Sequence, residues 1–371
     1  IGLCLVGSEM CIRDSPAGLA SRVERFARIS GKKQRSMRGQ LTIVGQGLAG
    51  TCLAWRLWSR DKSFRLLHLG EGQSASAISA GLLTPVTGRS LNPSWRLSEF
   101  LGEARAFYQQ VEGALGEKFF HEVPILRLFS SVEERRLYER KREAVKPWTE
   151  AFLEAEDCPC QAPHGGVVWK GGGRLDTRRF LEASGIFFRD SGLLETEEFD
   201  LMQAREAKEP TVMCTGAAGL GAGPFKFLPE RRAKGEILTV RIPGQPEDRV
   251  LSRNGWMIPL GEGLFRVGST YSWEDLTDAR TTSGRLQIES LVRSFTDLSF
   301  ETVEHVAGVR PIIRQSRPVI GSHPDNEILM IFNGLGSKGV LYGPGVAERL
   351  AAYLCEKVEI EEDLHIEALV G

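Results

Sequence analysis

One short segment constrains the fold of this chain more than any other. The four β-prone residues 41–44 lead directly into the motif Gly45-Gln-Gly47-Leu-Ala-Gly50, and an apolar helical pattern follows. A strand, a Gly-x-Gly-x-x-Gly turn and a helix in this order are typical of the start of a dinucleotide-binding βαβ unit. Gly45 permits the tight turn, Gly47 lets the backbone approach a pyrophosphate, and Gly50 lets the helix pack on the strand. The free N–H groups at the helix start would hold the phosphate charge.

The residues before this segment do not share its character. The stretch 4–15 is similar to translated sequencing-adapter read-through. It also fails as a signal peptide, because its apolar run is short and acidic residues lie beside it. We therefore expect residues 1–36 to be non-native read-through or a disordered extension, and Met37 to be the natural start.

Charge argues against a nucleic-acid partner. The chain has 47 Lys and Arg against 48 Asp and Glu, and residues 1–36 contain seven of the basic and three of the acidic residues. The remainder therefore has 40 against 45, a net charge of −5. A mildly acidic body offers no general electrostatic footprint for nucleic acid or an anionic membrane. No apolar stretch approaches the roughly 20 residues that a membrane-spanning helix needs.

Cysteine usage points to a reducing compartment. After residue 36 the cysteines are Cys52, Cys158, Cys160, Cys214 and Cys355. They contain no CxxC pair and no metal-like spacing with histidine, so we predict no metal site. Scattered thiols in odd number are typical of a cytoplasmic protein.

The second strand of the unit is predicted near residues 64–69. In dinucleotide-binding proteins an Asp or Glu at the end of this strand accepts hydrogen bonds from the ribose. Here His68 has that place, eighteen residues after Gly50, and Glu71 lies three residues further on. A neutral imidazole can accept one such bond, so we predict His68 as a weaker substitute. Small residues at 74–83 would then let the backbone lie against a bulky planar ligand.

A second glycine-rich loop lies near the end of the chain. The predicted strand 328–332 leads into Asn333-Gly-Leu-Gly-Ser-Lys-Gly-Val340, and a helix is predicted over about 344–353, with Pro344 in its first turn. An earlier apolar strand is predicted from Thr211 and ends in Thr215 and Gly216. A single NAD site does not need two such loops, but a flavin dinucleotide does. The first helix would meet the pyrophosphate, and the second would direct its N–H groups at the flavin pyrimidine ring.

With these motifs in place, the chain resembles the family of FAD-dependent D-amino-acid oxidases, and within it the glycine and sarcosine oxidase branch. The matching motifs are residues 45–50, 79–83, 214–216, 234–236, 267–270, 308–311 and 334–339, in the family's order. The resemblance implies an α/β fold in which a Rossmann-like FAD-binding domain is interleaved with a substrate domain built on a mixed or antiparallel β-sheet. It also implies oxidation of a C–N bond, with hydride transfer to flavin N5. The FAD should be non-covalent, because the flavin-linking cysteine of some relatives has no clear counterpart.

About 335 residues follow position 36, more than the roughly 250–300 that one core holds, so two domains are expected. We assign 37–115, 165–222 and 305–371 to a discontinuous FAD-binding domain. We assign 116–164 and 223–304 to the substrate domain.

The resemblance also names candidate site residues. Those expected to bind the cofactor are Gly45, Gly47, Leu48, Ala49, Gly50, His68, Ser79, Ala80, Gly81, Leu82, Leu193, Thr215, Gly216, Gly334, Leu335, Gly336, Ser337, Lys338, Gly339 and Val340. Leu193 would meet the adenine through the backbone of a strand predicted at 187–194.

Four residues are expected at the reacting end. The carboxylate of an amino-acid substrate needs a cation with fork geometry, which arginine supplies, and Arg310 matches the family's carboxylate-binding arginine. Trp256 and Tyr271 fall where this branch lines its pocket, and Lys338 lies where its ammonium can approach the flavin or the substrate. The alternatives are a structural ion pair for Arg310, core packing for Trp256 and a solvated loop lysine for Lys338.

Three functions fit these observations. The first is a flavin oxidoreductase of a small amine or amino acid, with oxygen or a quinone as the electron acceptor and a homo-oligomer as one option for assembly. The second is an oxidase related to the tRNA-modifying enzyme that removes a carboxymethyl group from a wobble uridine, suggested by the loop from Gly336 to Gly339. The third is a non-catalytic FAD-binding protein, suggested by His68.

Overall fold

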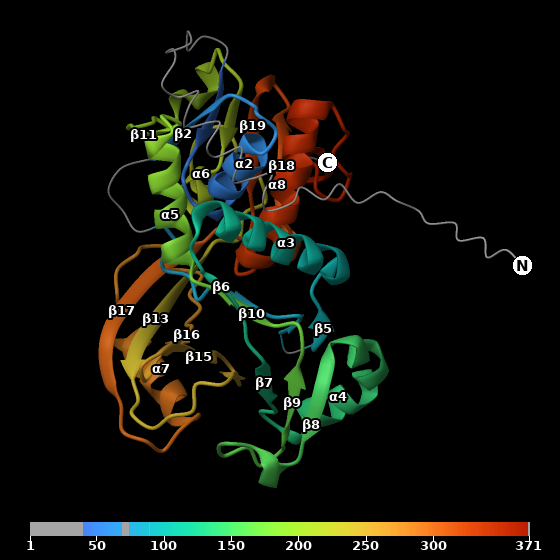
Figure 1. Ribbon diagram of the computed structural model, residues 1–371, viewed down its shortest axis with the longest axis vertical. Helices are drawn as coiled ribbons and strands as arrows, with labels where there is room; N and C mark the ends of the chain where they lie inside the picture. The colour runs from blue at the N-terminus through green and yellow to red at the C-terminus, as the bar shows by residue number, and fades with distance from the viewer. Residues whose placement is uncertain (1–39, 69–73, 89, 370–371) are drawn as a thin grey trace, which may run out of the picture.

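The computed structural model describes residues 40–68, 74–88 and 90–369. The segment 1–36, Met37 and Glu71 lie outside these residues. The chain forms an elongated molecule of two lobes, an upper one of sheet and helices and a lower one built on a large sheet (Figure 1).

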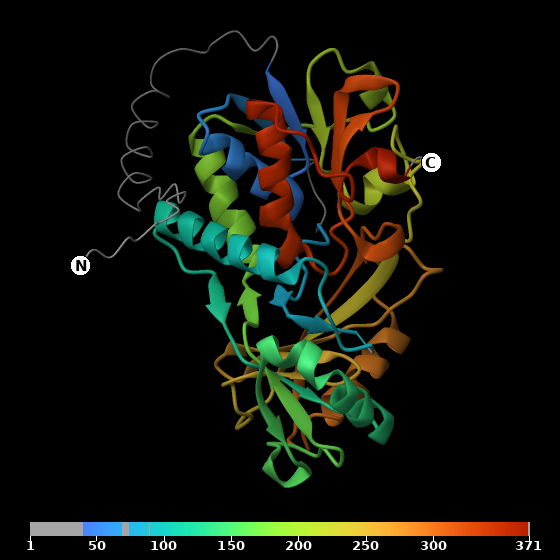
Figure 2. The ribbon, with the colours of Figure 1, turned by 90° about the vertical axis from the view of Figure 1, so that its right-hand side faces the viewer.

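The upper lobe contains a six-stranded sheet that is parallel except for one edge strand. Its order is β11 (Leu194–Thr196), β2 (Phe64–His68), β1 (Leu41–Val44), β12 (Thr211–Met213), β19 (Asn326–Asn333) and β18 (Val319–His323), with β18 antiparallel to β19. One face shares a core with four helices, α2 (Leu48–Trp58), α3 (Leu97–Leu115), α5 (Thr177–Asp190) and α8 (Gly339–Glu356). Figure 2 shows these helices gathered on one side of the sheet. The other face packs on three short helices, η3 (Gln203–Glu206), α6 (Gly216–Gly221) and η5 (Ile366–Leu369), and on Phe225 and Leu228.

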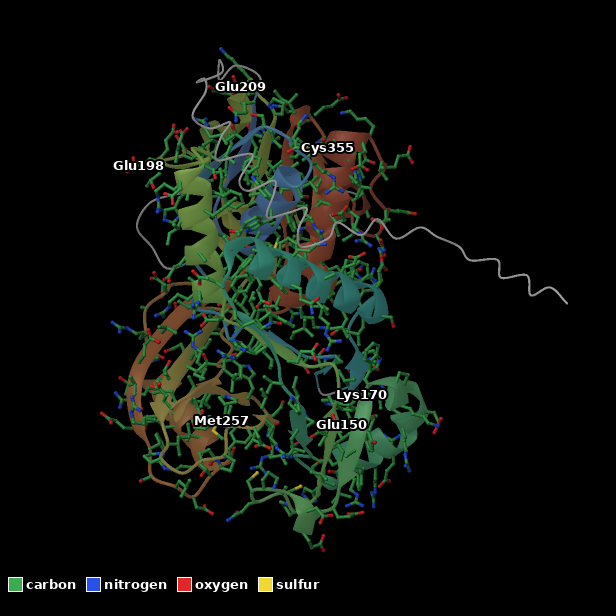
Figure 3. The ribbon with its side chains drawn as sticks, in the orientation of Figure 1. Glu150, Lys170, Glu198, Glu209, Met257 and Cys355 are labelled. Atoms are coloured by element: carbon green, nitrogen blue, oxygen red, sulfur yellow. The ribbon has the colours of Figure 1, made fainter. Side chains whose placement is uncertain are left out.

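The lower lobe is built on an eight-stranded mixed sheet. Its order is β17 (Glu301–Arg310), β13 (Ala233–Arg241), β16 (Leu264–Gly268), β15 (Trp256–Gly261), β14 (Val250–Ser252), β7 (Ile125–Leu128), β9 (Gly166–Trp169) and β8 (Thr149–Leu153). Only β14 and β7 pair in parallel among these neighbours. Helix α7 (Thr282–Arg293) packs on one face, over a core that includes Met257 (Figure 3).

Smaller elements connect the lobes. A three-stranded sheet has the order β3 (Leu82–Leu83), β10 (Gly173–Leu175) and β6 (Phe120–Glu122), and β4 (Val86–Thr87) pairs with β5 (Asn92–Pro93). The remaining elements are α4 (Val132–Val145), η1 (Lys146–Trp148), η2 (Ala155–Asp157) and η4 (Arg314–Ser316). No helix in the described part of the chain is both long enough and apolar enough to cross a bilayer.

The predicted division into domains cuts through the lower sheet. Strand β9 lies in 165–222, and β17 crosses the predicted boundary at 305, yet both pair within the eight-stranded sheet. The two strands therefore belong structurally with the segments 116–164 and 223–304. The crossings explain why no linker separates the domains along the sequence.

The strand predicted at 187–194 was wrong, because helix α5 continues to Asp190 and β11 begins only at Leu194. Phe180, Ser184 and Phe188 recur at helical spacing and are all fully buried. The indole N–H of Trp55 donates to Ser184 Oγ over 2.9 Å, and Trp55 stacks on Phe187 at 4.8 Å between ring centroids. These contacts with α2 favour the helix over the strand.

Helix α8 begins five residues before the predicted start, so that Pro344 lies inside it. A proline has no N–H to donate to the carbonyl four residues earlier, which here belongs to Val340. The buried hydroxyl of Tyr108 donates to that carbonyl over 3.0 Å. A side chain from α3 thus satisfies the acceptor that the proline leaves free.

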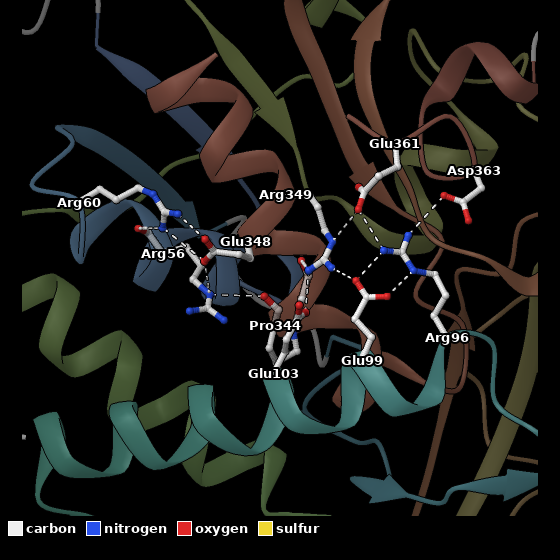
Figure 4. Close-up of polar contacts among 11 residues, drawn as sticks. Arg56, Arg60, Arg96, Glu99, Glu103, Pro344, Glu348, Arg349, Glu361 and Asp363 are labelled. Atoms are coloured by element: carbon white, nitrogen blue, oxygen red, sulfur yellow. Dashed lines mark hydrogen bonds and ion pairs between the residues drawn. The ribbon is translucent and has the colours of Figure 1, made fainter. Parts of the chain in front are cut away.

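Arginines and glutamates join α3 to α8 around a partly buried network (Figure 4). Arg349 on α8 pairs with Glu99, and also with Glu103 at 2.6 Å and Glu361 at 3.3 Å. Arg96 pairs with Glu99 at 2.6 Å and with Glu361 at 3.0 Å. Hydrogen bonds from Arg96, and then the charge of Arg349, hold the pKa of Glu99 below its usual value.

Replacing Tyr108 with Phe should lower the free energy of unfolding by about 1–3 kcal/mol, the cost of leaving a buried acceptor unsatisfied. In Pro344→Ala the new N–H of residue 344 can donate to the Val340 carbonyl, so the same Tyr108→Phe change should cost less. Urea unfolding of the wild type, both single variants and the double variant measures the two losses. Equal losses in the two backgrounds would contradict the explanation.

The network should also make stability depend on pH. A glutamate whose pKa is lower in the folded than in the unfolded state, where it is about 4.3, stabilises the fold above that value, and the contribution is lost as pH falls through the folded pKa. Unfolding followed between pH 3 and 6 should show this loss for the wild type and a shallower one for Arg349→Met. Arg135→Met, which removes a more exposed ion pair with Glu139, serves as the control and should leave the slope nearly unchanged.

Candidate active site

The two lobes enclose a cavity of about 1360 Å³. Its volume exceeds the roughly 300–1000 Å³ of ordinary ligand pockets, so a dinucleotide and a substrate can share it. The predicted site residues that line it are Gly45, Gly47, Leu48, Ala49, His68, Ser79, Ala80, Gly81, Leu82, Thr215, Gly216, Trp256, Tyr271, Arg310, Leu335, Gly336, Ser337, Lys338, Gly339 and Val340. Gly50, Leu193 and Gly334 are not among the lining residues.

The first glycine loop holds the start of α2 against the sheet. Gly45 has a φ of +107°, and a Cβ there would lie 2.6 Å from the carbonyl oxygen of Cys214. A Cβ at Gly50 would overlap the carbonyl oxygen of Gly45, so Gly50 has a close-packing role. The helix start has no side-chain cap at Gly47 and no acidic residue in its first turn. These features leave the positive end of α2 directed at the cavity.

The loop 74–83 contributes a residue that the sequence did not single out. Ser76 Oγ accepts a hydrogen bond from the N–H of Leu48 over 3.0 Å. A Cβ at Gly47 would lie 3.1 Å from the same oxygen, so the loop and the helix start are in close contact. The run of small residues had indicated such an approach, but not which serine makes it.

The second glycine loop brings the start of α8 beside the start of α2. A Cβ at Gly339 would lie 3.0 Å from Leu48 Cδ1. Lys338 is the N-cap residue of α8, which has no side-chain cap and no acid in its first turn. Burial lowers the pKa of Lys338, and none of the described carboxylates forms an ion pair with it. Gly334, with a φ of +79°, packs instead against Ile313.

Leu193 does not join the cavity because its backbone is engaged elsewhere. Its N–H donates to the carbonyl of Phe188 over 2.8 Å, and its carbonyl accepts from the N–H of Leu66 over 2.7 Å. The cavity is lined instead by a helical stripe of α5 that includes Leu181, Glu182 and Gly185. This stripe recurs at helical spacing in the sequence, and most of it precedes the segment 187–194 that was predicted as a strand.

Thr215 supplies a test of whether a polar ligand fits. Thr215 lines the cavity, and its hydroxyl is buried beside Gly219 with no hydrogen-bond partner within the described chain. Buried polar atoms are almost always satisfied, so this hydroxyl fits a bound polar group. Together with the starts of α2 and α8, whose N-cap residues supply no side-chain cap, it makes the cavity suitable for FAD. Among the described residues, no cluster of three or more His, Cys, Asp or Glu could hold a metal ion.

Arg310 lies at the end of β17, and no carboxylate of the described residues forms an ion pair with it. Its Nη2 donates to Ser269 Oγ over 2.6 Å, and both Nη atoms lie 3.4–3.5 Å from the Thr270 carbonyl oxygen. The Tyr271 ring lies beneath the guanidinium, 4.1 Å from its carbon. A Cβ at Gly235 would overlap the guanidinium, so only glycine leaves it this room.

Burial lowers the pKa of Arg310, and no carboxylate of the described residues pairs with it. The alternative of a structural ion pair therefore lacks its partner. A buried cation of this kind favours an anionic ligand, because an unpaired buried charge is costly.

Trp256 and Tyr271 line the same cavity as Arg310. The Trp256 side chain also packs against two apolar clusters, so it is both a core and a cavity residue. Tyr271 is 50% exposed and lies 5.8 Å from Trp273 between ring centroids. Arginine, two aromatic rings and lysine therefore border one space, as a pocket for a small carboxylate would require.

Comparison with known proteins shows what the chain resembles. The family model described as FAD dependent oxidoreductase (DAO) matches residues 40–353. Glycine oxidase from Bacillus licheniformis is 24% identical over 347 residues, covering 83% of this chain and 91% of that protein. The tRNA 5-methylaminomethyl-2-thiouridine biosynthesis bifunctional protein from Marinobacter nauticus is 24% identical, covering 85% of this chain and 56% of that protein. The crystal structure of glycine oxidase from Geobacillus kaustophilus has a TM-score of 0.75 at 19% identity, covers 86% of this chain and 95% of that one, and confirms the predicted fold class.

Thr215→Val keeps the side-chain shape but removes the hydroxyl. If this hydroxyl bonds to FAD, the dissociation constant of FAD should rise about tenfold, the equivalent of one lost hydrogen bond. The protein without FAD should unfold at the same or a higher urea concentration, because an unsatisfied buried group is gone. Thr51→Val is the matched control, since Thr51 Oγ1 is also buried without a partner but does not line the cavity. Unchanged FAD affinity in Thr215→Val would contradict the assignment.

Proposed function

The chain belongs to the DAO family of FAD-dependent oxidoreductases, and on this premise we propose that it oxidises the C–N bond of a small amine or amino acid whose carboxylate is held by Arg310. The observation that carries the proposal is the partly buried Arg310 guanidinium, which borders the cavity without a carboxylate partner among the described residues. The printed name of the Bacillus licheniformis relative, glycine oxidase, supports an amino acid as the substrate.

The geometry around Arg310 fits recognition of a carboxylate. Tyr271 covers one face of the guanidinium, and Ser269 engages one Nη atom from the side. A planar fork constrained in this way presents its remaining N–H groups in one direction, which suits two parallel hydrogen bonds to a carboxylate. The Tyr271 hydroxyl is a further polar group beside this position. The carboxylate would fix which substrate carbon faces the cofactor.

Bound FAD supplies, at flavin N5, the acceptor for the hydride that leaves the substrate carbon as C–N becomes C=N. The residues around it would set the electrostatics of that step. The positive end of α8 and the ammonium of Lys338 both lie at the cavity. Positive charge held there before the reaction would stabilise negative charge that develops on the cofactor side. Burial favours the neutral form of Lys338, so this contribution should weaken as pH rises.

A second candidate is removal of a carboxymethyl group from a larger, nucleotide-borne amine. The support is the relative named for tRNA 5-methylaminomethyl-2-thiouridine biosynthesis, together with the sequence Gly336-Ser-Lys-Gly339. The chain matches 56% of that bifunctional protein, so the remainder of its activity has no counterpart in the match. Such a substrate would also present a carboxylate next to the reacting amine. Anaerobic mixing with the modified nucleoside and with the intact RNA tests it.

We also propose a cytoplasmic location. The cysteines within the described residues are free thiols, which are favoured in a reducing compartment. The electron acceptor is proposed to be oxygen or a quinone. Mixing the reduced protein with each acceptor and following the return of the flavin band distinguishes them.

Arg310→Lys and Arg310→Met should retain FAD but bind amino acids at least roughly 30-fold more weakly, because truncating one partner of a buried charge pair costs about 2–5 kcal/mol. The measurement is anaerobic bleaching of the flavin band as a function of glycine concentration. Methylamine, which has no carboxylate, provides the control ligand. Arg317→Met provides the control variant, because Arg317 packs on Trp95 and does not line the cavity. Normal bleaching of Arg310→Met by glycine would exclude the carboxylate role.

A further inference from the structure

The cavity continues well beyond Arg310 along one face of the eight-stranded sheet. Residues that are paired across adjacent strands point to the same face. One such row is Ile237, Gly268, Trp256, Ser252 and Arg127, on β13, β16, β15, β14 and β7 in turn. Every residue of this row except Gly268 lines the cavity. Four strand spacings of about 4.8 Å make the row roughly 19 Å long.

Trp256 divides this space into two parts. On the side of Arg310 it packs with Ile78 and Ile237, and both of these line the cavity. On the other side it packs with a second apolar cluster, which includes Ile125 and Trp169. We name the space beyond Trp256 the distal arm. Its walls are Val86, Leu91, Ile125, Arg127, Trp169 and Ser252.

The walls of the distal arm are mainly apolar. Val86, Leu91, Ile125 and Trp169 are each no more than 4% exposed, so they form a fixed surface rather than mobile cover. They come from β4, the loop after it, β7 and β9, which are remote in sequence from Arg310. Because these side chains expose little of their own surface, a ligand group placed against them would gain mainly from the removal of its own apolar surface from water.

The one charged wall of the arm, Arg127, is already neutralised. Its Nη2 lies 2.6 Å from Glu134 Oε1, and Glu134 also accepts from the N–H and the hydroxyl of Ser130 over 2.8 and 2.6 Å. Arg310, by contrast, pairs with no carboxylate of the described chain. The two ends of the cavity therefore differ in what they can bind. An anion fits at Arg310, and an uncharged group fits in the distal arm.

A small amino acid held at Arg310 does not reach the distal arm, and none of the residues expected to bind the cofactor is among the walls of the arm. One residue of extended chain spans about 3.6 Å, less than a single strand spacing. We propose that the substrate carries a large, uncharged and mainly apolar group that the distal arm binds, and that Trp256 sets the size and shape of that group. The inference rests on the proposed oxidation of an amino acid anchored at Arg310. The group is attached either to the amine nitrogen or to the α-carbon, and both attachments use the same arm.

The test compares anaerobic flavin bleaching by glycine, sarcosine, N-benzylglycine and D-phenylalanine. The ratio of bleaching rate to dissociation constant should be at least tenfold higher for one of the two benzyl compounds than for glycine, since each methylene in an apolar pocket is worth roughly 10–200-fold. N-benzylglycine ahead of D-phenylalanine indicates attachment to nitrogen, and the reverse indicates attachment to carbon. A clear preference for glycine would overturn the inference and leave the proposed oxidation standing.

Ser252→Phe puts a ring into the arm, because Ser252 lies in the cavity-facing row between Trp256 and Arg127. It should reduce the benzyl-to-glycine ratio at least tenfold. Leu91→Ala, which widens the arm, should instead shift the preference towards groups larger than benzyl. The matched control is Ser283→Phe, because Ser283 is exposed on α7, which packs on the opposite face of the sheet. Unchanged ratios in both arm variants would show that the arm does not hold the substituent.

A second readout separates this inference from the proposed function. Binding of N-benzylglycine perturbs the flavin band whether or not oxidation follows. One outcome is that no amino acid bleaches the flavin, while N-benzylglycine binds and Ser252→Phe weakens that binding. This outcome would support the distal arm as a binding site and contradict the proposed oxidation. If N-benzylglycine neither binds nor reacts, the arm fails as well. Bleaching only by RNA that carries a carboxymethylated wobble uridine would replace the apolar occupant with a nucleobase and overturn the inference.

Discussion

The packing of α2 against α8 holds two helix N-termini side by side at one end of the cavity, and the arrangement of the cofactor site depends on it. Gly339 permits the contact, since even a Cβ there would press on Leu48. Behind the contact, Tyr108 satisfies the carbonyl that Pro344 leaves free, and Arg349 ties α8 to α3. At both helix starts the N-cap residue itself supplies no side-chain cap. The positive ends of the two dipoles thus remain available to a negatively charged ligand.

Charge is distributed differently in the site and in the scaffold. Several buried charges elsewhere in the protein have partners, as in the pairs of Arg127 with Glu134 and of Lys234 with Asp275. At the cavity, Arg310 and Lys338 have no carboxylate partner among the described residues, and burial lowers the pKa of each. A protein can tolerate such groups when a ligand supplies the missing negative charge. This contrast separates the two cations at the cavity from the ion-paired parts of the scaffold.

The eight-stranded sheet has one face in the core of the lower lobe and one face at the cavity, because residues along each strand alternate between the two faces. Successive residues point to opposite faces, so Leu126 and Leu128 join the core beneath α7 while Ile125 and Arg127 face the cavity. The cavity face can therefore vary without disturbing the core on the other side. On this face, Trp256 separates the end that suits a carboxylate from the end that suits an apolar group.

The sequence by itself determined the βαβ start, the second glycine loop and the fold class, because these follow from local patterns or from a recognisable order of motifs. The role of Arg310 in binding a carboxylate stays a prediction. The sequence misplaced the segment 187–194 and the start of α8, where contacts of Ser184 with Trp55 and of Tyr108 with Val340 override local signals. Only the tertiary structure decided which distant strands lie next to each other, such as β14 and β7. Pairing of that kind depends on the packing of whole elements, and no local periodicity encodes it. The distal arm, the stripe on α5 and the empty hydrogen-bonding capacity of Thr215 therefore emerged only once the chain was folded.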